Sequence, residues 1–365
     1  MRRLSVLFTN NTLSERAGSE TYVRDVALAL LRRGHHPVAF SLVLGPVADD
    51  LRQATVPVIA DLRQLSVAPD VIHGHHHLET LMAALRFPDV PIVHFCHGWI
   101  PWEESPLRHP SIQRYIAVDE VCRDRLVREE GIPADRVEVL LNFVDLRRFR
   151  PRGPLPVRPR RAVVFSNNAT TTGYVRTIEL ACAAHGMSLD LVGRNSGNST
   201  AAPEELLAGY DLVFAKARAA LEAMAVGCGV ILADNVGCGP LVTPDAFDRL
   251  RMRNFGIREL QHPHDAGWYE GEIAKYDVGA IGEVAARVRA EASLESAVDR
   301  LLTIYAQAIA EPRAACDLAA VVGDYLRRIA RPLKQVHELR AELQRKDEEL
   351  RYLASRIVPT DVSRS

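Results

Sequence analysis

The sequence predicts an α/β protein with two facing Rossmann-like domains, a cleft between them and a helical C-terminal extension. Three observations lead to this prediction. The chain has 365 residues, which is more than one ordinary domain holds. Short apolar runs alternate with amphipathic stretches in both halves, and a proline-rich segment separates the two halves.

Residues 1–150 show the strand and helix rhythm of a parallel sheet that is covered on both faces. Strands are expected over 4–9, 37–43, 71–73, 92–97 and 115–118. The clearest helix lies within 22–33, before the stop signal Gly34, because apolar side chains recur there at helical spacing: Val23, Val26, Ala27, Leu30 and Leu31. We therefore expect an N-terminal Rossmann-like domain over residues 1–150.

Residues 151–161 are predicted to be the interdomain linker, because four prolines there cannot continue a helix or a central strand. The α/β rhythm then restarts. Strands are expected over 162–166, 189–193, 212–215 and 230–234, with helices over 173–185 and 218–226. This second Rossmann-like domain is expected to span residues 162–310.

A closing helix is expected over 311–332 and a separate tail helix over 333–358. In the tail, side chains step by three and four residues in the heptad pattern of a coiled coil, with one lysine at a core position: Val336, Leu339, Leu343, Lys346, Leu350, Leu353 and Ile357. We favour a homo-oligomer formed through residues 333–358. An amphipathic helix that lies against its own domain is the alternative.

The composition indicates which classes of partner and which cellular compartment to expect for this protein. Lys and Arg number 45 against 46 Asp and Glu, so bulk charge does not attract nucleic acid, and no nucleic-acid partner is expected. Scattered cysteines and the lack of a signal peptide indicate reduced thiols in a cytoplasmic protein. Membrane contact is expected only at the cytoplasmic face and only peripherally, with the linker arginines as candidates for anionic headgroups; a solvated linker is the alternative.

Two segments are candidates for anion binding. Gly18, Ser19 and Glu20 lie between a strand and a helix, where free backbone amides face an anion. In residues 211–229 a strand runs into Lys216 and Arg218, and a helix begins there with Glu222 one turn in. Two cations beside helix amides suit a diphosphate, and a carboxylate suits the hydroxyls of a ribose. Solvated loop residues are the alternative interpretation.

Histidines follow two predicted strands: His73, His75, His76 and His77 after one, His94 and His97 at the next. No metal is expected, because neighbouring strand positions point to opposite faces and no acidic or cysteine partner has a ligand spacing. Polar side chains at the carboxyl edge of a parallel sheet instead suit ligand binding. His97 is our candidate for direct contact with substrate, with a structural strand-end histidine as the alternative.

Several stretches, taken in order, resemble glycosyltransferase family 4 and its GT-B relatives. Residues 18–35 are similar to the opening helix of that family, and residues 70–75 and 94–98 to its next two strand ends. Residues 115–118 and 131–149, which include Asn142, resemble the block that closes the first domain. Residues 222–230 resemble the most recognisable motif of the family, and residues 293–305 resemble its final helix. The resemblance covers about residues 1–310.

The resemblance implies a GT-B fold and a hexosyltransferase-like enzyme that moves a sugar from a nucleoside-diphosphate sugar, expected to be a uridine diphosphate sugar, with retention and without a cofactor or metal. It places the acceptor, which could be a glycan, a lipid-linked molecule or a small molecule, on the first domain and the donor on the second. Glu222 would bind the donor ribose, His97 would lie near the transferred sugar, and Gly18 would approach the donor phosphate. The remaining expected substrate-binding residues are Ser19, Glu20, His73, Asn142, Asn167, Asn168, Gly193, Arg194 and Ala219.

The sequence departs from the family pattern at two places. Phe214 stands where the family usually has a second glutamate, and Ser166, Asn167 and Asn168 follow the strand that usually leads to an Arg and a Lys. We therefore expect Lys216 and Arg218 to replace that pair as catalytic residues. The departures also leave two alternatives: a catalytically silent GT-B scaffold that binds a nucleotide, and a nucleotide-sugar 2-epimerase.

Overall fold

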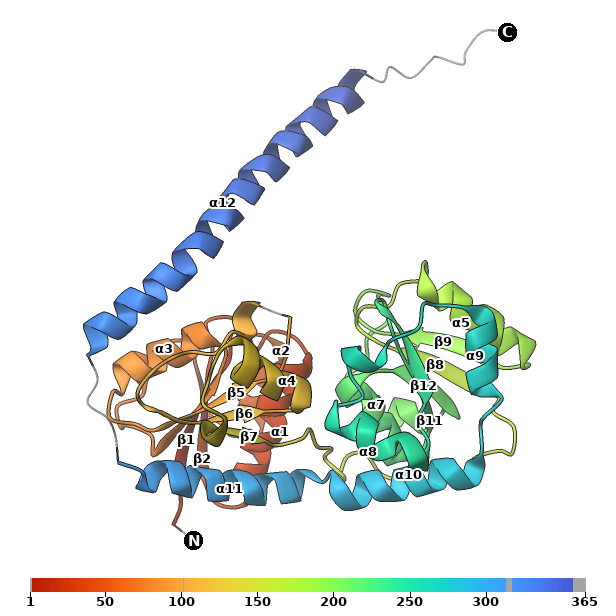
Figure 1. Cartoon of the computed structure of the whole chain (residues 1–365), viewed down its shortest axis with the longest axis horizontal. Coiled ribbons are helices and arrows are strands. Elements are labelled where there is room, and N and C mark those ends of the chain that lie inside the picture. The colour runs from red at the N-terminus through yellow and green to blue at the C-terminus, as the bar shows by residue number, and fades with distance from the viewer. Residues whose placement is uncertain (1, 101, 313–316, 357–365) are drawn as a thin grey trace. The chain divides into compact units, whose positions relative to one another are not determined.

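The computed structural model describes residues 2–100, 102–312 and 317–356 (Figure 1). The chain divides into two compact units: residues 1–107 with 111–313, and residues 108–110 with 314–365. The first unit holds two α/β lobes, each built on its own sheet. The predicted pair of Rossmann-like domains is therefore confirmed.

The sheet of the first lobe has the strand order β3-β2-β1-β4-β5-β6-β7, and each neighbouring pair runs parallel. Its strands are β1 (Ser5–Thr9), β2 (His36–Phe40), β3 (Val58–Ile59), β4 (Val71–His75), β5 (Ile92–Cys96), β6 (Ile112–Ala117) and β7 (Val137–Val139). The order reverses direction between β1 and β4. In an open parallel sheet, ligands bind at the carboxyl ends of strands beside such a reversal.

Helices α1 (Gly18–Arg32), α2 (Pro46–Gln53) and α11 (Leu294–Ala310) share one apolar core with this sheet. The helix α1 buries Val23, Val26 and Leu30, as their spacing predicts. Two further helices of this lobe are α3 (His77–Arg86) and α4 (Glu120–Asp124), and its short helical turns are η1 (Leu62–Gln64), η2 (Trp102–Glu104), η3 (Arg125–Glu129) and η4 (Ala134–Arg136).

The helix α11 follows the second sheet in sequence but packs in the first lobe, where Leu301 and Tyr305 are fully buried. The range 162–310 expected for the second domain therefore includes a helix whose core contacts lie in the first lobe. Its amphipathic pattern shows that α11 has an apolar face. The pattern does not show which sheet that face covers.

The sheet of the second lobe has the order β12-β11-β10-β8-β9, with an antiparallel edge strand β12 beside otherwise parallel strands. Its strands are β8 (Arg161–Phe165), β9 (Ser188–Val192), β10 (Leu212–Ala215), β11 (Gly229–Asp234) and β12 (Gly237–Leu241). Two cores lie on this sheet: one with α6 (Pro203–Leu207), α7 (Ala217–Val226), α8 (Pro244–Met252) and α10 (Val278–Glu291), the other with α5 (Tyr174–Ala184) and α9 (Ala266–Ile273). The turn η5 (Ile257–Glu259) follows α8.

The second unit contains α12 (Leu318–Arg356), a single helix where a closing helix over 311–332 and a separate tail over 333–358 were expected. Pro332 lies inside this helix. An exposed helix can continue past a proline at the cost of one backbone hydrogen bond and a steric adjustment. The last residue of the predicted seam, Ile357, lies outside the described residues.

Within the residues that the structure describes, we find no helix that is both long and apolar enough to cross a membrane. The described cysteines are free thiols and all are buried: Cys96, Cys122, Cys182, Cys228 and Cys238. Cys316 lies outside the described residues.

Candidate active site

A cavity of about 510 Å³ lies between the first turn of α1 in the first lobe and the strand ends of the second lobe. It is lined by residues of both lobes: Glu15, Arg16, Ala17, Gly18, Thr21, Arg24, Pro46, Arg148, Phe165, Ser166, Asn167, Val192, Gly193, Arg194, Ser199, Thr200, Ala201, Pro203, Arg218, Ala219 and Glu222. The predicted catalytic residue Arg218 lies in this wall, and so do six of the predicted substrate-binding residues: Gly18, Asn167, Gly193, Arg194, Ala219 and Glu222.

The helix α1 forms the first-lobe wall of the cavity. It begins at Gly18, and Gly18, Thr21 and Arg24 all line the cavity. Residues three apart lie on one face of a helix, so the helical spacing that predicted α1 also places these side chains together. Thr21 and Arg24 were absent from the predicted site, although their distance from Gly18 along the helix was a signal for them.

Arg218 and Glu222 form the opposing wall on α7. Arg218 Nε donates to Glu222 Oε1 at 2.8 Å, across one helical turn. Burial raises the pKa of Glu222 even though Arg218 lies beside it. Burial also disfavours the charge of Arg218, but the carboxylates of Asp25 and Glu222 outweigh this effect and raise its pKa. Arg218 is therefore a fixed cation at the N-terminus of a helix, where an anion binds favourably.

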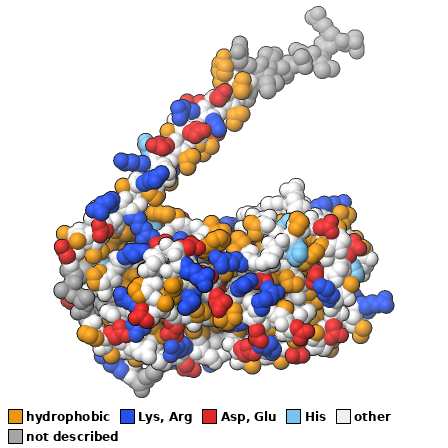
Figure 2. Space-filling model, in the orientation of Figure 1, with side chains coloured by type: hydrophobic (Ala, Val, Ile, Leu, Met, Phe, Trp, Pro, Cys, Tyr) orange, Lys and Arg blue, Asp and Glu red, His pale blue; other side chains and the backbone are white. Residues whose placement is uncertain are grey.

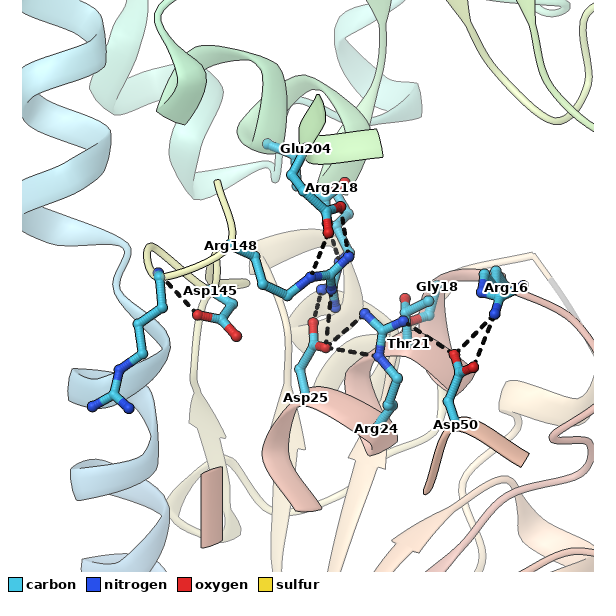
Figure 3. A network of polar contacts seen from close by, with 12 residues as sticks. Arg16, Gly18, Thr21, Arg24, Asp25, Asp50, Asp145, Arg148, Glu204 and Arg218 are labelled. Atoms are coloured by element: carbon cyan, nitrogen blue, oxygen red, sulfur yellow. Dashed lines mark hydrogen bonds and ion pairs between the residues drawn. The ribbon is translucent and has the colours of Figure 1, made fainter. Parts of the chain in front are cut away.

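Asp25 is buried and forms ion pairs with arginines from three segments of the chain (Figure 3). Arg218 of the second lobe forms an ion pair with Asp25 Oδ2, Arg24 donates to Oδ1 at 2.8 Å, and Arg148 approaches Oδ1 at 3.6 Å. Burial opposes the charge of Asp25, but the three guanidinium groups together lower its pKa below the usual range. The contact between Arg218 and Asp25 joins the two lobes.

Further carboxylates pair with the other arginines around the cavity. Arg148 also donates to Glu204 of α6 at 2.7 Å, and Asp50 accepts from Arg16 at 2.9 Å and lies 3.5 Å from Arg24 (Figure 3). The exposed Arg194 forms an ion pair with Glu15 across the lobes. The guanidinium groups of this cavity thus already have carboxylate partners, which a phosphate must displace or share.

Lys216, which the sequence predicts to act on a diphosphate together with Arg218, pairs with a carboxylate instead. Its Nζ lies 2.5 Å from Oδ2 of Asp234, a fully buried carboxylate at the end of β11. Asp234 also accepts from Ser166 Oγ at 3.0 Å and from Asn168 Nδ2 at 3.1 Å. Lys216 and Asn168 therefore fix the loop after β8 and the start of α7 to each other.

The strand ends of β8 and β9 complete the second-lobe wall. Asn167 accepts from the backbone N–H of Arg194 through its side-chain oxygen, at 3.2 Å. Gly193 packs directly against the carbonyl of Ser166, because a Cβ added at Gly193 would lie 1.9 Å from that oxygen. A glycine is therefore required at this crossing of two chain segments.

We expect Gly193→Ala to lower the melting temperature, because the added methyl must push two backbone segments apart. The cost is about 1–3 kcal/mol, typical of overpacking a rigid site. Gly18→Ala is the matched control for stability: apart from chain neighbours and its own helix backbone, no described heavy atom lies within 4 Å of the new Cβ. Differential scanning calorimetry of both variants checks this prediction, and an unchanged melting temperature for Gly193→Ala would contradict it.

His97 lies at the end of β5 and is half-buried. Its ring stacks on His75 at 4.5 Å and meets Tyr22 edge-on at 4.7 Å. The pKa of His97 is lowered to about 4, mainly by burial; Glu104 opposes this shift, and His76 and Arg218 add to it. The imidazole is therefore neutral near pH 7. Among the described residues its Nε2 has no hydrogen-bond partner, but this nitrogen is buried and His97 is not among the residues that line the cavity.

His73, expected to bind substrate, lies in the core of the first lobe instead. It is fully buried, stacks on Phe95 at 3.9 Å, and its Nδ1 is hydrogen-bonded to the hydroxyl of Tyr305. Because α11 covers this face of the sheet, the side chain of His73 points into the protein. Side-chain alternation along β4 sets this direction, which the sequence pattern alone does not assign to core or site.

Ser19 and Glu20 turn away from the cavity wall. Ser19 donates to Glu20 Oε2 at 3.0 Å, and Glu20 is buried. Burial raises the pKa of Glu20, with smaller effects from the neighbouring His76 and Glu104. Glu104 in turn accepts from the backbone N–H of His97 at 2.8 Å, and it thereby holds the segment that follows β5.

Asn142, also expected to bind substrate, is not among the residues that line the 510 Å³ cavity. It lines a second hollow together with Arg251 and Glu291, and its backbone carbonyl accepts from Arg251 at 2.5 Å. The structure therefore places Asn142 at the crossing between the lobes and does not bring it together with Arg218 and Glu222.

Residues 16–148 match the model of the Glycosyltransferase Family 4. Among solved structures, the chain is similar to a glycosyltransferase from Rickettsia africae, with a TM-score of 0.62 and 13% identity over 86% of this chain and all of the other. It is also similar to Anabaena HepE in complex with UDP-glucose, with a TM-score of 0.60 and 14% identity over 84% of this chain and all of the other. No curated protein sequence matches the chain.

The resemblance to glycosyltransferase family 4 is confirmed over residues 16–148, the part of the chain that the family model matches. The fold is GT-B. Phe214, at the position where the family usually has a glutamate, is fully buried and meets Tyr269 edge-on at 5.6 Å. An apolar core side chain therefore occupies the position at which the family pattern has a carboxylate.

Asp25 and Arg148 are candidate site residues for which the sequence gave no signal, and Arg24 was missed in spite of its helical spacing. Their roles depend on contacts between segments far apart in the chain: Arg218 and Asp25 are separated by 193 positions. Among the described residues, we find no group of three or more His, Cys, Asp or Glu that could hold a metal ion.

Proposed function

We propose that this chain transfers a sugar from a nucleoside-diphosphate sugar to a hydroxyl group of an acceptor, with the donor bound in the 510 Å³ cavity. The observation that carries the proposal is the pairing of Arg218 with Glu222 at the cavity wall, at the start of α7. A guanidinium and helix amides stabilise a departing diphosphate, and a buried carboxylate accepts hydrogen bonds from ribose hydroxyls. The Anabaena relative with the same fold was solved with UDP-glucose, which supports a uridine diphosphate sugar as donor.

In this proposal the bond between the sugar C1 and the diphosphate oxygen breaks, a bond between C1 and the acceptor oxygen forms, and the proton of the acceptor hydroxyl passes to the departing diphosphate. The negative charge that develops on the diphosphate is stabilised by Arg218 and by the amides of the first turn of α7, without a metal and with retention at C1. The neutral His97 lies near Arg218, and we place it beside the transferred sugar. The acceptor, a glycan, a lipid-linked molecule or a small molecule, approaches from the first lobe. We further propose that the chain acts in the cytoplasm and contacts the cytoplasmic face of a membrane only peripherally.

The experiment incubates the purified chain with UDP-sugars and an acceptor panel, in the presence of EDTA, and follows UDP release and the anomeric configuration of the product by NMR. We expect transfer with retention. Binding of UDP without turnover would favour a silent scaffold, and conversion of the donor without an acceptor would favour a 2-epimerase. If neither UDP nor any UDP-sugar raises the melting temperature, the donor site itself is wrong.

The role of Glu222 predicts a specific change in nucleotide preference. The native chain should bind UDP about tenfold or more tightly than 2′,3′-dideoxy-UDP, because a hydrogen bond to a charged group is worth about 1.5–3 kcal/mol. In Glu222→Ala this preference should disappear, even if both affinities fall. The ratio measured by isothermal titration calorimetry separates recognition of the ribose from general damage to the site, and an unchanged ratio would reassign Glu222.

A further inference from the structure

The second half of α12 presents an uncovered apolar seam. Before Pro332 the seam is partly covered, with Tyr325 buried and Val322 and Ile329 half-buried. Beyond Pro332 its side chains are largely exposed: Val336 45%, Leu339 64%, Leu343 62%, Leu350 63% and Leu353 51%. Figure 2 shows hydrophobic side chains along this helix between charged ones. A continuous exposed leucine seam indicates a surface that another molecule covers.

The seam has a heptad register from Val336 to Leu353, with Val336, Leu343 and Leu350 at a positions and Leu339, Lys346 and Leu353 at d positions. We propose that this segment pairs with the same segment of a second copy of the chain, and that the two helices run antiparallel.

The charges beside the seam favour a protein partner over a lipid surface. From 336 to 353 the helix has Glu338, Glu342, Asp347, Glu348 and Glu349 against Arg340, Arg345, Lys346 and Arg351. A helix that binds anionic lipid carries Lys and Arg on its polar face, whereas here acidic residues lie on both edges of the seam. A second protein helix can match these charges.

The position of Lys346 decides the orientation. In a parallel pair, equal positions face each other, so Lys346 would meet Lys346 of the other copy at a core layer. In an antiparallel pair, a positions pack against d positions, so Val336 packs against Leu353, Leu339 against Leu350 and Leu343 against Lys346. The ammonium group of Lys346 lies 3.4 Å from Glu342 of its own helix and reaches the edge of the seam.

The e positions support the same orientation. In an antiparallel pair, e positions face e positions, and Arg340 then faces Asp347 of the other copy on two symmetric sites. In a parallel pair, e faces g, and Asp347 would meet Glu342 of the other copy. The glutamates at g, Glu342 and Glu349, face one another in the antiparallel pair, but Lys346 lies between them in sequence and reduces their repulsion.

Asp347→Arg is the discriminating variant, because its effect has opposite signs in the two orientations. In the antiparallel pair the introduced arginine faces Arg340, so the dimer dissociation constant of the full chain should rise by about tenfold. In a parallel pair the introduced arginine would face Glu342 and tighten the dimer. The double variant Arg340→Glu with Asp347→Arg restores the attraction and should return the constant to within about threefold of the native value. Sedimentation equilibrium measures all three.

Two further measurements complete the test. Leu350→Asp should yield a monomer, whereas a monomeric native chain would overturn the proposal. Val336→Cys and Leu353→Cys, prepared as separate full-length variants, should form a disulfide only when mixed, because the two positions face each other in the antiparallel pair. Efficient crosslinking of either variant with itself would establish the parallel orientation and overturn the proposal.

Discussion

Replacing Asp25 by Asn is expected to destabilise the chain by about 3–5 kcal/mol, because it removes the carboxylate at which Arg24, Arg148 and Arg218 converge. The neutral amide of asparagine has the same shape but no negative charge, so it no longer offsets the repulsion among these guanidinium groups. Chemical denaturation of the variant measures the loss. Asp50→Asn is the matched control: Asp50 also contacts Arg24, but its side chain is 27% exposed, so its loss should cost about 0–1 kcal/mol.

The same variant tests whether Asp25 competes with a bound diphosphate. UDP should raise the melting temperature of Asp25→Asn more than that of the native chain, because the freed arginines gain an anionic partner. An equal or smaller rise would show that the arginines held by Asp25 do not contact the ligand. A loss of stability no larger than that of Asp50→Asn would contradict the structural role of the carboxylate.

The pKa of Asp25 also predicts the direction in which the stability of the fold changes with pH. Its pKa in the folded chain is lowered below the usual range, although burial acts in the opposite direction, because of Arg218, Arg24 and Arg148. A lowered folded pKa contributes stability that is fully present above the unfolded pKa of about 3.9 and is lost as the pH falls through the folded value. The native chain should therefore lose this contribution only below about pH 4, and Asp25→Asn should lack it.

The sequence predicted the elements of the fold better than their packing. The strand at 212–215 and the helix from 218 to 226 lie where apolar periodicity placed them, and the structure begins that helix one residue earlier. The antiparallel strand β12 had no such signal, because Gly237, Gly239 and Pro240 are untypical of a strand. Periodicity reports which face of an element is apolar, but the pairing of distant elements depends on the whole core.

The same limit applies to the site. Helical spacing brought Arg218 and Glu222 together, since residues four apart share a face. It also placed Lys216 near them, but the buried Asp234 on the neighbouring strand binds this lysine instead. The partner of a charged side chain is set by which strands are adjacent in the sheet, and that information is not contained in local spacing.

Arg218→Ala is expected to lower the turnover of sugar transfer by about a hundredfold to a thousandfold, the effect of removing one preorganised donor to a developing charge. Arg218 lines the cavity, stands at the N-terminus of α7 and has a raised pKa, so it keeps its charge at every working pH. Arg218→Lys should recover only part of the activity, because an ammonium group cannot bind a phosphate in the planar bidentate manner. Steady-state kinetics on UDP-sugar and acceptor measure both variants.

Loss of Arg218 also removes a partner from Asp25 and Glu222, so the fall in activity must be separated from a loss of folding. Arg152→Ala is the matched control: Arg152 is a mostly buried arginine that donates to Asp211 at 2.9 Å within the second lobe, away from the cavity wall. We expect it to lower stability while the turnover of the folded fraction stays near the native value. If Arg152→Ala and Arg218→Ala lower turnover equally at matched folded fractions, the role of Arg218 is structural and the diphosphate is stabilised elsewhere in the cavity.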